Sequence, residues 1–264
     1  MAVETDPIAD RPALARLTGK VALVTGSTSG IGEGISRLFA AEGAAVVLAG
    51  RRAQLGERIA RDLAEGGHAA MFVASDLTDR AAAARLVERA VERFGKLDVL
   101  VNNAGATGRG PTHDFSEEDF DRTVDTNFKG TFFTTKAAIP HLLRSDAPRV
   151  INITTIAAHR GLPGAAVYGA SKAAIEALTK HWAVEYGAQG LRVNAISPGL
   201  IEAPMAAGLL ANPDFVARNV LPNIPAGRVG RPHDVAHTAL FLATDEADYL
   251  SGVSIALDGG SSAG

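Results

Sequence analysis

From Lys20 onward, short apolar runs rich in β-branched residues alternate with segments in which apolar residues recur at helical spacing. This alternation constrains the fold more than any other feature, because strands separated by helices pair in parallel and bury both faces of the sheet. We predict a doubly wound α/β fold with a parallel sheet of about seven strands and helices on both faces. The expected strands cover residues 21–24, 45–49, 69–73, 99–101, 149–153, 192–196 and 254–257.

No Pro/Ser-rich linker, internal repeat or charge run divides the chain. We therefore expect one domain over residues 17–264, after a loose leader over residues 1–16. The leader carries acids and prolines where a signal peptide would need a basic start and an apolar run. Residues 200–225 combine prolines with apolar residues, which predicts a loop or small helical lid beside the end of a strand, where α/β sheets bind ligands.

Charge and cysteine content exclude several functions. The 26 basic and 29 acidic residues give a net charge of −3, so no basic field favours nucleic acid or an anionic membrane. The apolar runs are far shorter than the roughly 20 residues of a membrane span. The absence of cysteine excludes disulfides, thiolate metal sites and cysteine nucleophiles, and makes a cytoplasmic location the simplest expectation. The histidines lack metal-ligand spacing, so we predict no metal.

A glycine-rich turn follows the first expected strand and opens the first helix. Such a turn lets a pyrophosphate approach the backbone, and the helix N-terminus supplies N–H donors, so we expect a dinucleotide cofactor. Its expected contacts in this turn are Gly26, Thr28, Ser29, Ile31 and Gly32.

Two arginines stand where a ribose-reading acid would be expected, about 20 residues past the last glycine. The chain reads Arg51-Arg52 there, and a guanidinium suits a 2′-phosphate that a carboxylate would repel. The pattern favours NADP(H) over NAD(H). The alternative is that both arginines are solvated charges at the start of a helix.

Tyr168 and Lys172 are four residues apart in a segment with helical periodicity, so the phenol and the ammonium share one helix face. An ammonium close to a phenol stabilises the phenolate, and we expect a lowered pKa that makes Tyr168 usable as an acid and base. A tyrosine and a lysine at this spacing are also common as a simple surface pair.

Taken together, the motifs resemble those of the short-chain dehydrogenase/reductase family, in order and in spacing. The resemblance rests on residues 25–32, the Asn102-Asn103-Ala104-Gly105 motif, Asn127, the Tyr168-x-x-x-Lys172 motif and the Pro198-Gly199 pair. It extends from about Leu17 to Gly260 and implies a single-domain Rossmann fold.

The resemblance implies four catalytic residues. Tyr168 would exchange a proton with the substrate oxygen, Lys172 would hold the nicotinamide ribose, and Asn127 would orient a water relay. The serine that the family places thirteen residues before the tyrosine is Thr155 here. A threonine keeps a hydroxyl that can donate to the substrate oxygen, while its methyl group narrows the pocket. The alternative is that Thr155 is an ordinary strand residue that makes no contact with the substrate.

The resemblance also implies further cofactor contacts. Asp76 and Leu77 would hold the adenine, although Asp76 could instead serve a turn or helix cap. Backbone at Ile201 would hold the nicotinamide amide, but Ala203 replaces the family's usual threonine and removes a hydroxyl. The other implied contacts are Asn103, Ala104, Gly105, Pro198, Gly199, Tyr168 and Lys172.

The expected substrate pocket is largely apolar with one polar group. Its residues would be Thr155, His159, Leu162, Tyr168, Met205 and Leu209, although His159 could be a solvated loop residue instead. The aromatic residues Phe128, Phe132 and Phe133 indicate core or interface packing. In this family the helices that carry them and Tyr168 form a contact between subunits, so the resemblance implies a homotetramer.

These observations predict an NADP(H)-dependent enzyme of class EC 1.1.1.-, a carbonyl reductase that transfers hydride between nicotinamide and a ketone, 3-oxoacyl group or secondary alcohol. Reduction of an enoyl or dienoyl thioester is the alternative reaction, because residues 152–155 and 181–185 are similar to the fatty-acyl-CoA reductase branch. A protein of another class, a non-catalytic NADP sensor, would tend to lack Tyr168 or Lys172. Both residues are present.

Overall fold

In the computed structural model, which describes residues 14–263, seven parallel strands form one sheet in the order β3-β2-β1-β4-β5-β6-β7. Every predicted strand is confirmed, with ends that differ by no more than two residues. The strands are β1 (Val21–Thr25), β2 (Ala45–Gly50), β3 (Ala70–Ala74), β4 (Val99–Asn102), β5 (Arg149–Ile153), β6 (Arg192–Pro198) and β7 (Ser254–Leu257).

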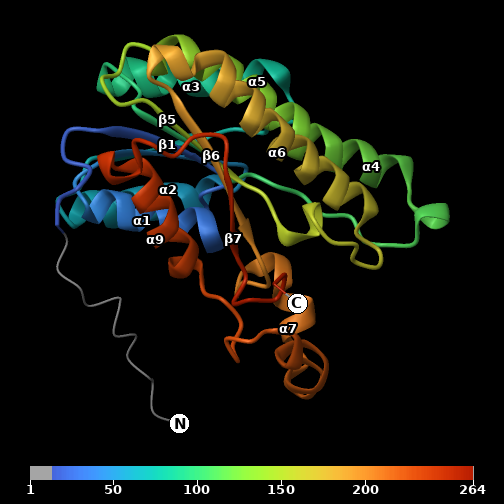
Figure 1. The fold of residues 1–264 in the computed structure, drawn as a ribbon. Helices are drawn as coiled ribbons and strands as arrows, with labels where there is room; N and C mark the ends of the chain where they lie inside the picture. The colour runs from blue at the N-terminus through green and yellow to red at the C-terminus, as the bar shows by residue number, and fades with distance from the viewer. Residues whose placement is uncertain (1–13, 264) are drawn as a thin grey trace.

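Helices cover both faces of the sheet (Figure 1). On one face lie α1 (Gly30–Ala41), α2 (Ala53–Glu65) and α9 (Pro232–Ala243). On the other lie α3 (Arg80–Phe94), α5 (Gly130–Leu142) and α6 (Ala166–Tyr186), and α4 (Glu117–Val124) continues the direction of α5 away from the sheet. The predicted doubly wound architecture of a single Rossmann-like domain is confirmed.

Alternating residues of the strands divide between two apolar layers, one on each side of the sheet. In β1, Ala22 and Val24 pack with Ile35 and Phe39 of α1. The intervening Leu23 packs on the opposite side, with the helices of the second face. All five β1 residues are buried, as expected of a central strand covered on both faces. The core therefore holds β1 up to its carboxyl end.

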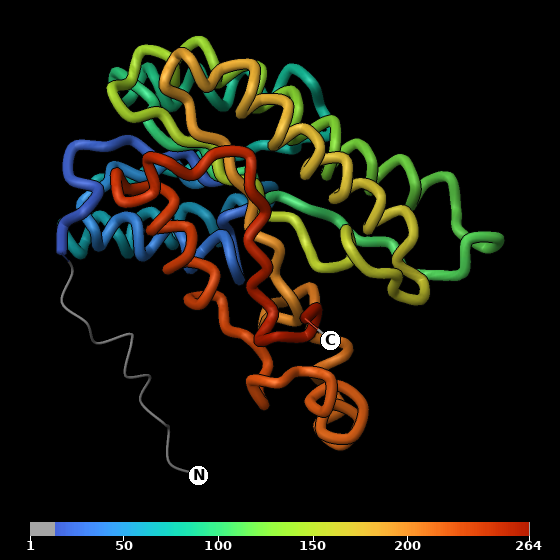
Figure 2. Tube along the Cα trace, viewed as in Figure 1, coloured from blue at the N-terminus to red at the C-terminus, as the bar shows by residue number. Residues whose placement is uncertain are grey.

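Residues 1–13 of the expected leader lie outside the described part of the chain. Arg16, assigned to the leader, contacts the domain, because its backbone N–H donates to Glu42 Oε2 at 3.0 Å. The expected lid consists largely of short helical turns, which include η5 (Pro204–Ala206), α7 (Ala207–Leu210), α8 (Pro213–Phe215) and η6 (Val216–Val220). Figure 2 shows that this segment projects beyond the carboxyl ends of β6 and β7. Within residues 14–263, no helix is long and apolar enough to cross a membrane.

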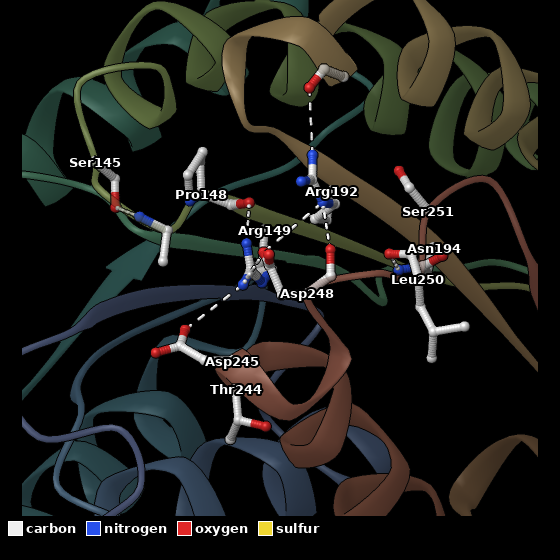
Figure 3. Close-up of polar contacts among 12 residues, drawn as sticks. Ser145, Pro148, Arg149, Arg192, Asn194, Thr244, Asp245, Asp248, Leu250 and Ser251 are labelled. Atoms are coloured by element: carbon white, nitrogen blue, oxygen red, sulfur yellow. Dashed lines mark hydrogen bonds and ion pairs between the residues drawn. The ribbon is translucent and has the colours of Figure 1, made fainter.

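A charged cluster closes the amino-terminal end of the sheet, opposite the lid (Figure 3). Arg149, at the start of β5, has only 2% of its side chain exposed, and its guanidinium lies 3.2 Å from Asp248 Oδ1 and 3.5 Å from Asp245 Oδ1. Burial lowers the pKa of Arg149, an effect that the two carboxylates oppose. Arg192 of β6 donates to the Asp248 carbonyl oxygen. The cluster therefore ties the starts of β5 and β6 to the segment that precedes β7.

This cluster predicts an asymmetric effect of substitution on the free energy of unfolding. The double variant Asp245→Asn/Asp248→Asn leaves a buried cation without an anion and should cost about 2 kcal/mol, whereas Arg149→Met leaves two carboxylates that water solvates and should cost less than about 1 kcal/mol. Urea unfolding of both variants measures the difference. A larger loss in Arg149→Met would contradict this account of the cluster.

Candidate active site

The turns after β1 and β4 are joined at the carboxyl edge of the sheet. Thr25 Oγ1 accepts hydrogen bonds from the backbone N–H groups of Asn103 and Ala104, both at 3.0 Å. The Asn103 side chain donates to the carbonyl oxygens of Thr25 and Gly26 at 2.9 and 3.1 Å. The structure therefore brings the glycine-rich turn and the Asn103–Gly105 motif together, as the sequence predicts.

The glycines of these turns leave room that a side chain would fill. Gly26 has a φ of +65°, and a Cβ there would lie 2.7 Å from Ala104 Cα. A Cβ on Gly105 would lie 3.5 Å from Asn127 Oδ1 and 3.6 Å from Lys172 Nζ, so Gly105 keeps the space beside these groups open. The N-terminus of α1 begins at Gly30, in the same turn. An open backbone cradle at a helix N-terminus fits a dinucleotide.

The two arginines after β2 have different surroundings. Arg52 donates from its guanidinium to Thr28 Oγ1 at 2.8 Å and also to Ser29 Oγ, so it lies across the glycine-rich turn. Arg51 is exposed, and among the described residues it makes no hydrogen bond or ion pair. A free guanidinium beside an anchored one fits an anionic group at the ribose end of a dinucleotide.

Asp76, expected near the adenine, is exposed and stabilises a turn. Its Oδ1 accepts hydrogen bonds from the backbone N–H and the hydroxyl of Thr78, at 3.1 and 2.9 Å. Leu77 is buried in the apolar layer on the α3 side of the sheet. Asp76 also lines a cavity of about 230 Å³ with Ser75, whose buried hydroxyl has no partner among the described residues. Asp76 therefore has the turn-stabilising role that the sequence analysis gave as the alternative. Only its Oδ1 takes part in the turn, and Oδ2 does not.

Tyr168 lies in the first turn of α6, and its phenol interacts with the hydroxyl of Thr155, the residue that follows Thr154 beyond the end of β5. Thr154 turns away, since its hydroxyl lies 2.9 Å from Glu176 Oε1 and 3.0 Å from the Ile196 carbonyl oxygen. Thr155, and not Thr154, is therefore the threonine whose hydroxyl faces the phenol.

The pKa of Tyr168 differs from the sequence expectation. Burial raises it, while the hydrogen bond from Thr155 and the positive charge of Arg109 act in the opposite direction. The expected lowering was wrong for the unliganded protein, because the loss of hydration penalises the phenolate more than its neighbours favour it. Tyr168 is therefore a protonated phenol at neutral pH.

Lys172 is buried one helical turn beyond Tyr168, and its Nζ donates to the Ile153 carbonyl oxygen at 2.8 Å. Burial lowers its pKa to about 8. An ammonium has three N–H groups, so two donors remain for further partners beside Gly105. The predicted spacing thus brings the phenol and the ammonium to one helix face, with the ammonium held at the end of β5.

Asn127 is buried where the helix expected around it changes its pitch. Residues Asp125–Lys129 form a π-helical turn, η2, between α4 and α5. The Asn127 side chain accepts from the Ala106 N–H at 2.7 Å and donates to Ser171 Oγ at 3.0 Å. Such single π turns recur at functional sites, because they shift backbone groups out of the ordinary helical pattern. The side chain thereby joins this turn to the segment after β4 and to α6.

His159, expected in the substrate pocket or in solvent, is instead held by an acid. Its Nε2 lies 2.8 Å from Glu176 Oε1, and 48% of its side chain is exposed. Glu176 is buried, and the same oxygen also accepts the hydroxyls of Thr154 and Ser254. The imidazole is therefore committed to a network that ties the segment after β5 to α6 and β7.

The remaining expected contacts surround the end of β6. Pro198 ends that strand, Gly199 packs so closely on Asp258 that a Cβ would lie 2.8 Å from Asp258 Cβ, and Ile201 forms an isolated bridge with Gly230. Met205 and Leu209 are 53% and 36% exposed in the lid, and their contact with substrate stays a prediction. Leu162 is partly buried.

Sequence reasoning missed three residues of the site. Ser171 directly precedes Lys172 in the sequence, and Glu176 follows Lys172 by one helical turn on the same helix face. Their positions relative to Lys172 could therefore have indicated both residues. Arg109 carried no signal, because its position depends on how the loop after β4 folds. Its charge acts on the Tyr168 phenol.

The chain is similar to oxidoreductases over nearly its whole length. A family model described as Enoyl-(Acyl carrier protein) reductase matches residues 26–262. Oxidoreductase UcpA of Salmonella typhimurium is 41% identical over 94% of this chain and 96% of its own length. The 3-oxoacyl-[acyl-carrier-protein] reductase FabG of Thermotoga maritima is 39% identical over 93% and 98%.

A solved structure agrees with these matches. A protein of Beutenbergia cavernae assigned as an NAD(P)-dependent gluconate 5-dehydrogenase, solved with NADP bound at low occupancy, is 34% identical with a TM-score of 0.89. The match covers 96% of this chain and all of that chain.

The buried ammonium predicts a gain in stability when it is removed. Because the pKa of Lys172 falls from 10.5 to about 8 on folding, the charged form disfavours the folded state by about 3 kcal/mol below pH 8. Lys172→Met removes this penalty but leaves the Ile153 carbonyl without its donor, so we expect a net gain of about 2 kcal/mol at pH 7.

The pH dependence of this gain in stability follows from the pKa values of Lys172 in the unfolded and folded states. The gain should shrink as the pH rises from about 8 and become a loss of about 1 kcal/mol above 10.5, where the lysine is neutral in both states and only the lost hydrogen bond to the Ile153 carbonyl remains. Urea unfolding at several pH values measures it, with exposed Lys180→Met as the control. A gain that is the same at pH 7 and at high pH would show that the ammonium's charge is not its source.

Proposed function

The chain belongs to the short-chain dehydrogenase/reductase family, and we propose that it is an NADP(H)-dependent enzyme that interconverts a carbonyl compound and a secondary alcohol. The observation that carries the proposal is the pairing of the Tyr168 phenol with the Thr155 hydroxyl, one helical turn from the buried Lys172 ammonium. This arrangement offers a proton and a second hydrogen-bond donor to one substrate oxygen. The substrate would be a ketone, a 3-oxoacyl group or the corresponding alcohol.

In the direction of reduction, Tyr168 gives its phenolic proton to the carbonyl oxygen. Thr155 donates a hydrogen bond to the same oxygen as negative charge develops there, a contribution typically worth about 10²–10³ in rate. Lys172 supplies positive charge near the phenol and stabilises the phenolate that remains. Asn127 holds the π turn and the Ala106 segment in place, so that a water relay can return a proton to this site.

The nicotinamide cofactor would supply the hydride that reaches the carbonyl carbon. The residues that would hold it are the glycine-rich turn, Asp76 and Leu77, the Asn103–Gly105 motif, and the backbone at Pro198, Gly199 and Ile201. Lys172 would use its two remaining donors on the nicotinamide ribose. We propose NADP(H) rather than NAD(H), because Arg51 is an unpaired cation beside Arg52 at the end of β2.

We also propose assembly into a homotetramer. Support comes from large apolar side chains on the α4, α5 and α6 face, where Phe120, Phe132 and Val184 are 49%, 36% and 85% exposed. Phe132 lies beside the buried Trp182, with ring centroids 6.2 Å apart, so this exposed surface continues into the core. Apolar surface of this kind favours contact with a second copy. A cytoplasmic location stays a prediction.

Reduction of an enoyl thioester is the second candidate, because the matching family model is described by that activity. The phenol and hydroxyl converge on one oxygen, however, which suits a carbonyl group better than a carbon–carbon double bond. A non-catalytic sensor would not need this pair of donors.

Replacing Tyr168 with phenylalanine tests the proposed chemistry. The variant keeps the ring but loses the proton, so we expect kcat for ketone reduction to fall by about 10²–10⁴ with little change in the cofactor Kd. Steady-state rates with a panel of ketones, 3-oxoacyl thioesters, quinones and enoyl thioesters measure turnover, and fluorescence titration measures cofactor binding. Unchanged ketone reduction would refute the mechanism, and turnover of enoyl thioesters alone would favour the second candidate.

The cofactor choice predicts a selective effect of Arg51→Ala. The Kd for NADPH should rise at least about tenfold, while that for NADH should change less than about twofold, because only NADPH carries a 2′-phosphate. Arg52→Ala also removes the contacts to Thr28 and Ser29 and should weaken both nucleotides. Arg61→Ala, an exposed position on α2, is the matched control. Equal losses of NADPH and NADH in Arg51→Ala would rule out a 2′-phosphate contact.

A further inference from the structure

Two loops border the face of Tyr168: residues 105–115, which follow β4, and residues 159–165, which precede α6. The backbone N–H of Gly110 donates to the Gly164 carbonyl oxygen at 3.1 Å and fastens these loops together. The contact is close, since a Cβ on Gly164 would lie 3.3 Å from Gly110 N. The two loops also run side by side below α6 in Figure 2.

Arg109 is held at this junction by its two glycine neighbours. Gly110 carries the contact to Gly164, and Gly108 is packed so that a Cβ would lie 2.6 Å from the Phe115 ring and 3.2 Å from Asp119 Cβ. Gly164 comes directly before the first turn of α6, which carries Tyr168. The backbone therefore places Arg109 next to the loop that leads into α6, and its charge acts on the Tyr168 phenol.

The other basic side chains around this face already have partners. His159 is paired with Glu176 at 2.8 Å, Arg160 donates to the Ser261 carbonyl oxygen at 2.7 Å, and Lys172 donates to the Ile153 carbonyl oxygen at 2.8 Å. Arg109 is exposed and makes no hydrogen bond or ion pair with any residue of the described range 14–263. Arg109 is thus a cation that acts on the Tyr168 phenol and has its five donors available.

We propose that Arg109 binds a carboxylate of the substrate, so that this protein acts on oxo or hydroxy acids rather than on neutral ketones and alcohols. A guanidinium and a carboxylate form two parallel hydrogen bonds, which would fix the substrate's orientation as well as add affinity. A single unpaired guanidinium suits a singly charged carboxylate. A phosphate would more often recruit several cations or backbone N–H groups. The inference rests on the proposed carbonyl chemistry and names its substrate class.

The test compares each oxo acid with its neutral ester. The probes are 4-oxopentanoate, 4-oxocyclohexanecarboxylate and their methyl esters, reduced by the wild-type protein, Arg109→Gln and Arg109→Lys. We expect the wild type to prefer the acid, and Arg109→Gln to lose at least about tenfold more in kcat/KM for the acid than for the ester, whose smaller loss reports the effect of the charge on the Tyr168 phenol alone. Arg109→Lys keeps the charge without the planar fork and should fall between them.

Arg160→Gln is the matched control, because it removes the same charge from a neighbouring loop while its guanidinium is already hydrogen-bonded. We expect less than about a threefold change in the preference for the acid. An equal loss in Arg160→Gln, abolished by high salt, would show a diffuse field and overturn a specific contact.

A pair of thioesters separates the carboxylate from a phosphate source. Acetoacetyl-coenzyme A carries phosphates, and S-acetoacetyl-N-acetylcysteamine carries none. A loss in Arg109→Gln confined to the coenzyme A thioester would overturn the carboxylate assignment. A wild-type protein that reduces the esters as well as the acids would refute the inference and leave the proposed function standing. Failure to reduce any carbonyl in the panel would refute the proposed function itself.

Discussion

The parallel pairing of β1 with β4 is the constraint on which the site depends. Leu23 lies opposite Leu100 in this pair, and the sheet continues outward through β2 and β3 on one side and β5, β6 and β7 on the other. The chain therefore leaves β1 and β4 in opposite directions, which opens a crevice at their carboxyl ends. Thr25 joins the two strands at the base of that crevice, because its hydroxyl accepts hydrogen bonds from the N–H groups of Asn103 and Ala104.

Three successive turns of helix α6 contact the end of β5 and the two residues that follow it. The Tyr168 phenol interacts with Thr155, Lys172 is hydrogen-bonded to the Ile153 carbonyl oxygen, and Glu176 is hydrogen-bonded to Thr154. Three consecutive residues are thus each held by a different turn of one helix face. A shift of the helix along the strand would break all three contacts at once, so the distance between the phenol and the Thr155 hydroxyl is strongly determined.

The strands and the helix face of Tyr168 and Lys172 could be predicted, because their signals are local. Full burial produces continuous apolar runs, and a four-residue interval produces a shared helix face whatever the rest of the fold does. The surroundings of Arg52, His159 and Arg109 could not be predicted in this way. Each depends on which distant segment covers it: the glycine-rich turn for Arg52, α6 for His159 and the junction of two loops for Arg109.

The expected lowering of the Tyr168 pKa was wrong for the same reason, because that pKa depends on how the folded chain surrounds the phenol. The sequence reveals the nearby lysine but not how completely the fold removes water from both groups. That burial raises the pKa of the phenol and lowers that of the ammonium to about 8. At neutral pH the unliganded site therefore holds a protonated phenol beside a charged ammonium. These are the forms that can give a proton to a carbonyl oxygen and then stabilise the phenolate, whereas alcohol oxidation needs the phenolate at the start. The protonation states of these two groups therefore suit the proton transfer proposed for the reduction step.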